Sequence, residues 1–281
     1  MDDERPSTTP STTPSTTELK KELRAKFRQL RRDSTNPGSE LARQRHAPLA
    51  LEDLGRFLNI SDGTPTCQPI AEDLAVKDLA QAQRQHSEMI QGTAPGIPQG
   101  ATQRTAAAFV SAPDEPDTTG LLSWLAAHGW RIITPAMHYA QPLPDGSIPD
   151  DTAPTRNGKL LTIGWQQLAV SSGPLRNSAI VADTGTGAGT GTDERVPSMG
   201  AGELSTADVI FVPAVAVDRH GVRLGHGAGW YDRALMHRAA GAMLIAVVWP
   251  WEITDSLPYD RYDVRMDAVL TSQGVRRFAA L

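Results

Sequence analysis

The sequence predicts an α/β fold, a three-layer sandwich with a largely parallel central sheet flanked by helices. Ala106 to Ser111 and Trp130 to Thr134 are apolar runs of strand length, with a helical pattern, Thr119 to His128, between them. Strand, helix and strand within about 30 residues indicate a βαβ unit, whose two strands are parallel. Met243 to Trp249 is a β-rich apolar run typical of a central strand.

Composition narrows the class of protein. The chain has 281 residues, of which 40% are hydrophobic, so it has enough apolar residues to build a core. The net charge of −5 argues against a general nucleic-acid binder. A single cysteine, Cys67, excludes an intrachain disulfide and a cysteine metal cluster. The sequence has no apolar run of membrane-spanning length and no signal-peptide pattern, so we expect a cytoplasmic protein without a membrane partner.

The N-terminal region predicts a tail followed by an amphipathic helix. Residues 1–16 repeat Ser, Thr and Pro and are expected to form a disordered tail. Ser15 and Glu18 fit a capping box, which starts the helix at Ser15 or Thr17. An apolar stripe and a basic stripe then lie side by side at helical spacing. The basic stripe fits either a solvated face or an anion site. The apolar stripe is Leu19, Leu23, Phe27 and Leu30, and the basic stripe is Lys20, Arg24, Arg28 and Arg31.

Further elements are expected along the chain. Helices are predicted at Leu49–Leu58 and Leu74–Ile90, short strands at Leu160–Ile163, Leu168–Ser171 and Ala179–Ala182, a flexible Gly/Thr linker at Asp183–Thr192, and a final strand at Asp267–Thr271.

The stretch from Asp208 to Leu235 has the pattern of an anion-binding loop. Two apolar runs are followed by Arg223, by glycines at alternate positions (Gly225, Gly227, Gly229) and by a helical pattern. Glycines let the main chain approach a phosphate, and a helix N-terminus presents free N–H groups. The spacing matches neither a dinucleotide fingerprint nor a Walker A loop. Phosphate binding and a plain strand-to-helix turn both fit it.

The motif R-L-G-H-G-A-G-W-Y-D-R, preceded by V-P-A-V-A-V-D-R-H-G-V, resembles the signature of the 5-formyltetrahydrofolate cyclo-ligase family, R-x-G-x-G-x-G-Y-Y-D, with Trp230 in place of the first tyrosine. The resemblance extends over 17–32, 106–135 and 204–275. It implies a NagB/RpiA/CoA transferase-like fold. It also implies a single α/β domain over 17–281, with insertions near 35–100 and 176–200.

The resemblance implies a reaction as well. ATP, with magnesium, activates the formyl group of 5-formyltetrahydrofolate: the formyl oxygen attacks the terminal phosphate, the neighbouring folate nitrogen closes the ring, and phosphate leaves. The products are 5,10-methenyltetrahydrofolate, ADP and phosphate, and a monomer is expected. A catalytically silent relative that binds folate or nucleotide and regulates a partner is the alternative, motivated by the insertions and the Thr-rich tail. A third reading is an unrelated phosphosugar or acyl transferase on a similar scaffold.

Site residues follow from the matching motif positions. Lys20 and Arg24 match the family's K-x-x-L-R and would reach ATP phosphates. Glu115, in E-P-D-T, matches a glutamate that contacts the pterin, although acidic residues there also fit a helix cap. Asp263 matches a magnesium-binding aspartate, with Asp260 as a competitor. His226 fits either a phosphate contact or a solvent-facing position, because many relatives have arginine there.

The predicted sets are as follows. The catalytic cations are Lys20, Arg24 and Arg223. ATP would be bound by these three together with Leu224, Gly225, His226, Gly227, Ala228, Gly229, Trp230 and Tyr231. Substrate would meet Glu115, Arg24, Trp230 and Tyr231, with the two aromatic rings serving either a ligand ring or packing, and magnesium would meet Asp232 and Asp263. Lys20, Arg24, Glu115, Arg223, Asp232 and Asp263 should therefore line one cleft.

Overall fold

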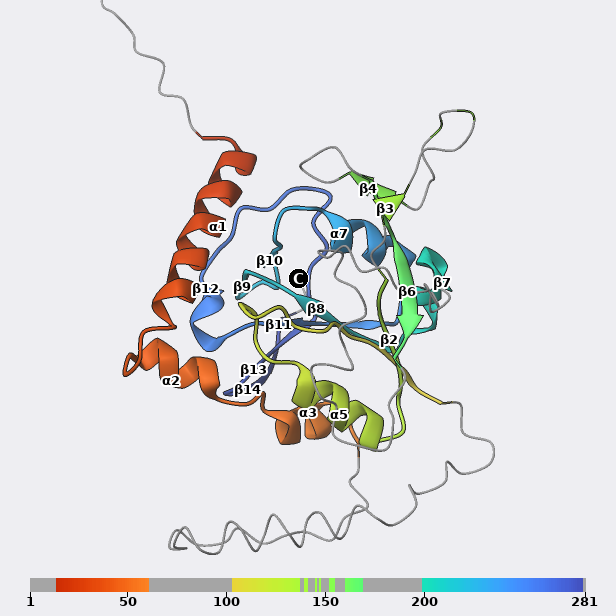
Figure 1. Cartoon of the computed structure of the whole chain (residues 1–281), viewed down its shortest axis with the longest axis horizontal. Coiled ribbons are helices and arrows are strands. Elements are labelled where there is room, and N and C mark those ends of the chain that lie inside the picture. The colour runs from red at the N-terminus through yellow and green to blue at the C-terminus, as the bar shows by residue number, and fades with distance from the viewer. Residues whose placement is uncertain are drawn as a thin grey trace, which may run out of the picture.

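A computed structural model of the chain describes residues 14–60, 103–136, 139–140, 145, 147, 152–154, 160–168 and 199–279. Its centre is an eight-stranded sheet with the order β14-β13-β11-β8-β1-β2-β6-β7. Figure 1 shows this sheet crossing the middle of the molecule, with helices around it. A mixed α/β fold with a large, mostly parallel central sheet is thus confirmed. Cys67 and the elements predicted at Leu74–Ile90, Ala179–Ala182 and Asp183–Thr192 lie outside the described residues.

The five inner strands of the sheet run parallel, and the edges are antiparallel. The inner strands are β1 (Thr105–Ala107), β2 (Arg131–Pro135), β8 (Val209–Pro213), β11 (Met243–Val247) and β13 (Ala268–Thr271). The antiparallel edge strands are β14 (Gly274–Arg277), β6 (Gly164–Gln167) and β7 (Met199–Gly200). All five residues of β8 are buried, as expected of a central parallel strand. The predicted βαβ unit is confirmed, since β1 and β2 pair in parallel.

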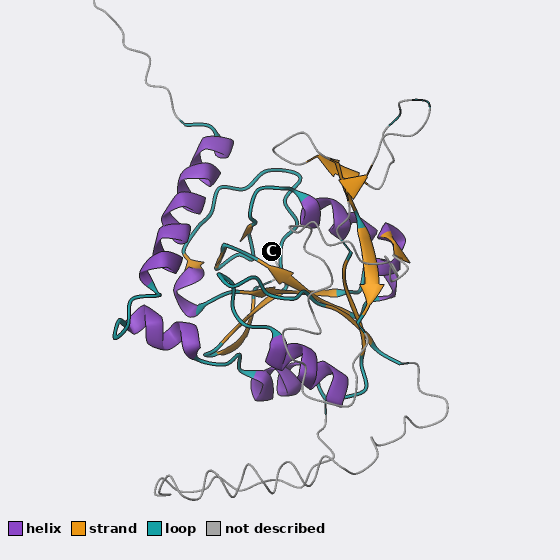
Figure 2. Ribbon diagram, viewed as in Figure 1, coloured by secondary structure: helices purple, strands orange, loops and turns teal. Residues whose placement is uncertain are grey.

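Each face of the sheet has its own apolar core, because side chains alternate along a strand. Val209 and Phe211 of β8 pack with α3 (Leu51–Phe57) and α5 (Thr119–Ala127). Ile210 and Val212 pack with η1 (Ala201–Thr206), α7 (Trp230–Ala234) and η2 (Leu235–His237). Figure 2 shows α3 and α5 together on one side of the sheet and α7 on the other.

Helix α1 (Thr16–Asp33) packs against a small three-stranded sheet instead of the central one. Its N-terminus has the predicted capping box. The hydroxyl oxygen of Ser15, the N-cap, accepts the N–H of Glu18, and the Glu18 carboxylate accepts the N–H of Ser15. Phe27 is buried among residues of β9 (Ala216–Asp218) and β10 (Arg223–Leu224), and Leu23 and Leu30 pack beside it. The predicted apolar stripe therefore docks α1 onto the segment just before the glycine loop. The third strand of this sheet is β12 (Ile253–Thr254), and α2 (Glu40–His46) follows α1.

Several elements differ from the sequence prediction. Strand β6, Gly164–Gln167, was not predicted, and Trp165 is a buried residue of it; Leu168 lies just beyond this strand, and the rest of the strand predicted at Leu168–Ser171 lies outside the described residues. The strand β1 is shorter than Ala106–Ser111, because the chain leaves the sheet after Ala107 to form the loop that carries Glu115. The remaining elements are η3 (Pro250–Glu252) and a second small sheet of β3 (Tyr139–Ala140), β4 (Thr152–Pro154) and β5 (Leu160–Thr162). In the part of the chain that the structure describes, no helix is long and apolar enough to span a membrane.

Candidate active site

A cavity of about 900 Å³ opens at the carboxyl ends of β1, β2 and β8. The chain crosses over from β1 to β2 in one direction and from β8 to β11 in the other, so the strand order reverses between β1 and β8. Ligands of open parallel sheets bind outside the carboxyl ends of strands at such a switch point. The residues after β1 and Pro213 at the end of β8 line the cavity accordingly.

The cavity brings together residues that are far apart in the sequence. All six residues predicted to line one cleft do so, although their roles stay predictions. Leu224 is the one predicted site residue that does not line the cavity; its side chain is buried under α1. The predicted residues that line it are Lys20, Arg24, Glu115, Arg223, Gly225, His226, Gly227, Ala228, Gly229, Trp230, Tyr231, Asp232 and Asp263.

The glycine loop has a backbone that requires glycine at two positions. Gly227 has φ +100° and Gly229 has φ +69°, in the left-handed region that side chains disfavour. Gly229 is also the N-cap of α7, which is a single short turn, Trp230–Ala234. The strand–loop–helix pattern is present, but the helix is too short to contribute much dipole to an anion site.

Helix α1 fixes this loop from outside. Nε of Arg24 donates to the carbonyl oxygen of Gly225 at 2.8 Å, and Nη2 of Arg28 donates to that of His226 at 3.3 Å. These bonds join residues 201 and 198 positions apart. The basic stripe is therefore not a solvated face: it sets the position of the loop and of the cavity wall.

Lys20 is a buried cation with two acidic partners. Nζ lies 2.6 Å from Oδ2 of Asp263 and 2.9 Å from Oδ2 of Asp260. Burial acts to lower the pKa of Lys20, but the two aspartates outweigh it and raise that pKa. The Lys20 ammonium in turn lowers the pKa of Asp260. A positive charge is thus held in the wall of the cavity.

Arg223 is a second buried cation that lines the cavity. It forms an ion pair with Asp232 and donates from Nη1 to the carbonyl oxygen of Pro213 at 3.3 Å. Its Nε is buried with no hydrogen-bond partner among the described residues. A buried guanidinium N–H without a partner costs free energy unless a ligand satisfies it.

The two predicted magnesium ligands are both paired with cations. Asp232 pairs with Arg223, and Asp263 accepts from Lys20 and from the backbone N–H of Asp260 through Oδ2. Within the described ranges, no three His, Cys, Asp or Glu side chains gather as a metal site would require. Magnesium often binds through only one or two carboxylates plus substrate phosphates and water, so the two aspartates fit an ion that arrives with a nucleotide.

Glu115 and His226 face each other inside the cavity. Oε2 of Glu115 accepts the backbone N–H of Ala112 at 2.8 Å, and Oε1 lies 3.4 Å from Nε2 of His226. Burial raises the pKa of Glu115. Burial, together with the charge of Arg31, lowers the pKa of His226 to about 4, so its imidazole is neutral at neutral pH. Of the neighbouring acids, Asp117 accepts the N–H of Thr119, the first residue of α5, although the N-cap of that helix is Thr118.

The two aromatic residues of the motif have different environments. Trp230 belongs to the core: its indole N–H donates to the carbonyl oxygen of Thr162 at 2.9 Å, and its ring packs edge-on against Trp165 and Tyr231. The hydroxyl of Tyr231 is buried and finds no hydrogen-bond partner in the described part of the chain. Burial raises the pKa of Tyr231, so the hydroxyl keeps its proton and can donate to a ligand.

Sequence reasoning missed the partner of Arg31. Arg31 does not line the cavity; its Nε donates to Oε1 of Glu252 at 2.6 Å, and its Nη2 donates to the carbonyl oxygen of Ala214 at 2.8 Å. Burial raises the pKa of Glu252 to about 7. This buried pair joins the last turn of α1 to η3. Pro-Trp-Glu alone gives no signal of such a pairing, because the two residues are 221 positions apart.

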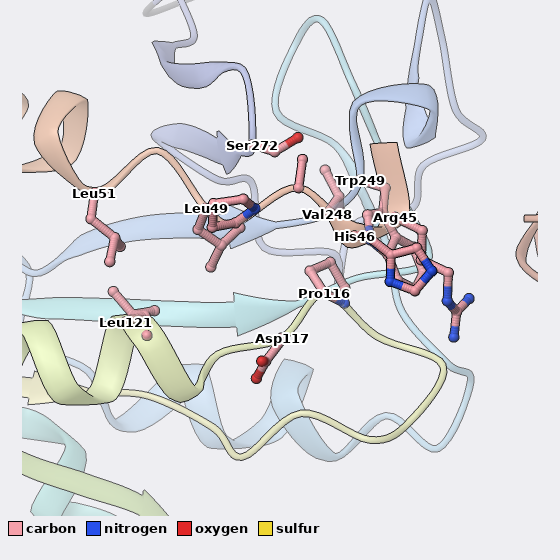
Figure 3. Close-up of a pocket in the computed structure, with 13 residues that line it drawn as sticks. Arg45, His46, Leu49, Leu51, Pro116, Asp117, Leu121, Val248, Trp249 and Ser272 are labelled. Atoms are coloured by element: carbon pink, nitrogen blue, oxygen red, sulfur yellow. The ribbon is translucent and has the colours of Figure 1, made fainter. Parts of the chain in front are cut away.

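A second, smaller cavity of about 280 Å³ lies on the α3 and α5 side of the sheet. Figure 3 shows its walls, which include Leu49, Leu51, Leu121 and the ring of Pro116. Its arginine, Arg45, is held by the hydroxyl of Ser34 and the carbonyl oxygen of Pro113. This cavity is smaller than a typical ligand pocket of about 300–1,000 Å³. It is therefore a poorer nucleotide site than the large one.

An α/β domain with a glycine-bordered cavity at the switch point of its sheet, lined by Lys20, Arg24 and Arg223 together with four carboxylates, is the architecture of an α/β enzyme that binds a small molecule there. Residues 74–272 match the family model of the 5-formyltetrahydrofolate cyclo-ligase family, and the chain belongs to that family.

Relatives carry the same name. The chain is 38% identical over 169 residues to a 5-formyltetrahydrofolate cyclo-ligase of Mycolicibacterium smegmatis, covering 60% of this chain and 73% of the relative. It is 26% identical over 176 residues to that of Escherichia coli, covering 61% and 79%. A solved structure, 5,10-methenyltetrahydrofolate synthetase of Aquifex aeolicus, is similar with a TM-score of 0.45 and 20% identity, covering 94% of each chain.

Proposed function

We propose that the protein is a 5-formyltetrahydrofolate cyclo-ligase, which converts 5-formyltetrahydrofolate and ATP into 5,10-methenyltetrahydrofolate, ADP and phosphate. Family membership supports the reaction. The observation that carries the assignment of the site is the meeting of α1 with the glycine loop: Lys20 and Arg24 line the same cavity as Arg223. A cavity of about 900 Å³ is large enough for a nucleotide beside a second ligand group.

The residues would act mainly by placement and charge. Phosphoryl transfer needs its two oxygens in line and cations on the phosphate oxygens, with little covalent help from the protein. Lys20 and Arg223, which both line the cavity and are held by acidic partners, would bind the triphosphate. The Nε of Arg223 and the hydroxyl of Tyr231 are buried donors that a ligand oxygen would satisfy. Glu115 would hold the pterin.

Magnesium, when bound, neutralises phosphate charge and orients the terminal phosphate for transfer. Asp232 and Asp263 would hold it, with water and phosphate oxygens completing the shell. Each aspartate now pairs with a cation, so we propose that Lys20 and Arg223 turn towards phosphate as the carboxylates turn towards the ion. Asp260, the second acidic partner of Lys20, would then remain to favour the charged form of its ammonium.

We also propose the finer features that the family resemblance implies. Helical elements on both faces of the sheet support a three-layer, NagB/RpiA/CoA transferase-like architecture. The domain would span 17–281, with a tail at 1–16 and insertions near 35–100 and 176–200. A cytoplasmic monomer without nucleic-acid or membrane partners is expected, and light scattering after gel filtration would test its mass.

The test is an absorbance assay for the methenyl product with purified protein, 5-formyltetrahydrofolate, ATP and magnesium. Product that depends on ATP and is lost in Arg223→Ala would support the proposal. If no ATP-dependent product forms at high enzyme concentration while either ligand still binds, the regulatory alternative replaces it.

A further inference from the structure

The loop that carries Glu115 is held from outside the large cavity by an arginine of α2. We infer that Arg45 is a positioning residue for Glu115: by bonding the carbonyl oxygen of Pro113, it holds the loop where the Glu115 carboxylate can meet the pterin. Arg45 itself does not line the large cavity. The inference rests on the proposed function, in which Glu115 binds that part of the substrate.

The loop, residues 109–118, is closed by its own hydrogen bonds at its base and at its tip. At the base, the hydroxyl oxygen of Thr118 accepts the N–H of Ser111 at 3.1 Å, and the hydroxyl oxygen of Ser111 accepts the N–H of Thr118 at 3.2 Å. At the tip, the N–H of Ala112 donates to Oε2 of Glu115 at 2.8 Å, and the N–H of Glu115 donates to the carbonyl oxygen of Ala112 at 2.9 Å. These bonds define the shape of the loop, but none of them ties its tip to another element.

Arg45 provides that tie. Its Nη2 donates to the carbonyl oxygen of Pro113 at 2.7 Å, and no other hydrogen bond among the described residues joins 111–117 to a distant part of the chain. Pro113 is the second residue of the four-residue turn that the bond between Glu115 and Ala112 closes, a position that proline favours. A displacement of Pro113 therefore moves the Glu115 carboxylate with it.

The guanidinium of Arg45 is held in place on its other sides. Nη1 donates to the hydroxyl oxygen of Ser34 at 3.0 Å and to the carbonyl oxygen of Arg31 at 3.3 Å, both at the end of α1. Its Cζ lies 4.9 Å from the centroid of the ring of Trp249, a buried residue just after β11. Because a guanidinium is a planar fork, it can donate in two directions while its face rests on an aromatic ring. Arg45 thus joins the end of α1 and the end of β11 to the loop that carries Glu115.

A second arginine acts on the charge of Glu115. Nη1 of Arg31 lies 4.0 Å from Oδ2 of Asp114, in the same loop. Burial raises the pKa of Glu115, whereas the N–H of Ala112 and the charge of Arg31 lower it, so Arg31 favours the ionised carboxylate. The two arginines have different effects: Arg45 sets the position of the carboxylate, and Arg31 favours its charge.

A comparison of the two substrates separates this role from a general structural one. In Arg45→Ala, the KM for 5-formyltetrahydrofolate should rise about 10-fold, which corresponds to the loss of one hydrogen bond to a charged group. The KM for ATP should stay at the wild-type value, because the cations proposed to bind the triphosphate are held by other residues. Arg43→Ala is the matched control: it lies on the same helix, its pair with Glu40 is exposed, and both KM values should equal those of the wild type.

A double-mutant cycle measures whether the effect passes through Glu115. In a Glu115→Gln background, Arg45→Ala should raise the KM for 5-formyltetrahydrofolate by less than about twofold, because the two substitutions remove the same interaction. A full additional 10-fold rise in that background would overturn the inference. So would an unchanged KM for 5-formyltetrahydrofolate in the single variant Arg45→Ala, or an equal rise in its KM for ATP.

Thermal melts identify any variant that does not fold. Arg45→Gln keeps much of the apolar stem of the side chain but is too short to bond both α1 and Pro113, and it carries the same predictions if Arg45→Ala does not fold. Equilibrium binding of 5-formyltetrahydrofolate to the wild type distinguishes the two levels of the account. If the wild type neither binds it nor forms the methenyl product, the proposed function fails and the inference falls with it. If the wild type is active and neither variant changes the KM for 5-formyltetrahydrofolate, the inference alone is wrong.

Discussion

Replacing Arg31 by alanine should destabilise the protein in a pH-dependent way. The Arg31 side chain is 3% exposed and that of Glu252 is fully buried, so the variant leaves a carboxylate inside the protein with only the N–H of Trp249 as a partner. Removing one member of a buried ion pair costs about 3–5 kcal/mol. We expect a loss of that size in the free energy of unfolding at pH 8.

The sign of the pH dependence follows from Glu252. Burial raises its pKa from 4.5 to about 7 in the folded state, so its contribution to stability is present below pH 4.5 and is lost as pH rises through about 7. Arg31 lowers that pKa, so removing it raises the pKa further and extends the window upward. The variant should therefore lose less stability at pH 5, where Glu252 takes up a proton, than at pH 8.

Urea unfolding at pH 5 and pH 8 measures both effects. Arg32→Ala is the matched control, since the side chain of this neighbouring arginine is exposed and, among the described residues, bonds only Gln29; the variant should change stability by less than about 0.5 kcal/mol. The double variant Arg31→Met with Glu252→Leu should recover most of the loss, because it removes both buried charges. A loss below about 1 kcal/mol at pH 8, or no recovery in the double variant, would refute this account of how α1 is held.

Three further variants test the cavity itself. Arg223→Ala should lower kcat/KM for methenyl formation about 10²–10³-fold, the usual cost of losing a preorganised charge at the transition state, and wild-type turnover would rule out its role. Gly227→Ala should cost about 1–2 kcal/mol of stability, because Gly227 has a φ of +100° that a side chain disfavours. It should also weaken ATP binding, as measured by titration calorimetry. Gly241→Ala is the control and should change neither quantity, because a side chain at that position would meet open space. Tyr231→Phe should leave the melting temperature nearly unchanged, because the hydroxyl lacks a partner among the described residues. The variant should raise the KM for the ligand to which the hydroxyl donates. Equal KM values for ATP and for 5-formyltetrahydrofolate in the variant and the wild type would contradict a role of this hydroxyl in binding.

Much of the fold follows from local patterns in the sequence. Ser15 and Glu18 predict the start of α1 because the capping box is a local interaction, and the apolar run of β11 predicts a central strand because parallel strands are buried on both faces. Strand β6 is not predicted, because its sequence, GWQQ, has a single large apolar residue, Trp165, whose ring fills the core beside Trp230. Edge strand β14 is four residues long with two exposed arginines, and its sequence has no apolar alternation.

The candidate site was predictable only in part. The glycine loop and the basic stripe of α1 could each be predicted, and the family resemblance joined them. The partners of the cations could not, because Lys20 meets Asp260 and Asp263 only after the C-terminal segment folds over α1, 240 and 243 positions later. Likewise, the contact of His226 with Glu115 joins two loops that no periodicity relates. Tertiary pairing, not local pattern, decides those positions.

The central claim is that α1 and the glycine loop hold one triphosphate between them. A crystal structure with a non-hydrolysable ATP analogue and magnesium tests it most directly. The predicted result is a triphosphate in the large cavity that contacts Lys20, Arg223 and backbone N–H groups of the glycine loop at once. An analogue that contacts the loop but no residue of α1, or one bound in the smaller cavity beside Arg45, would contradict it.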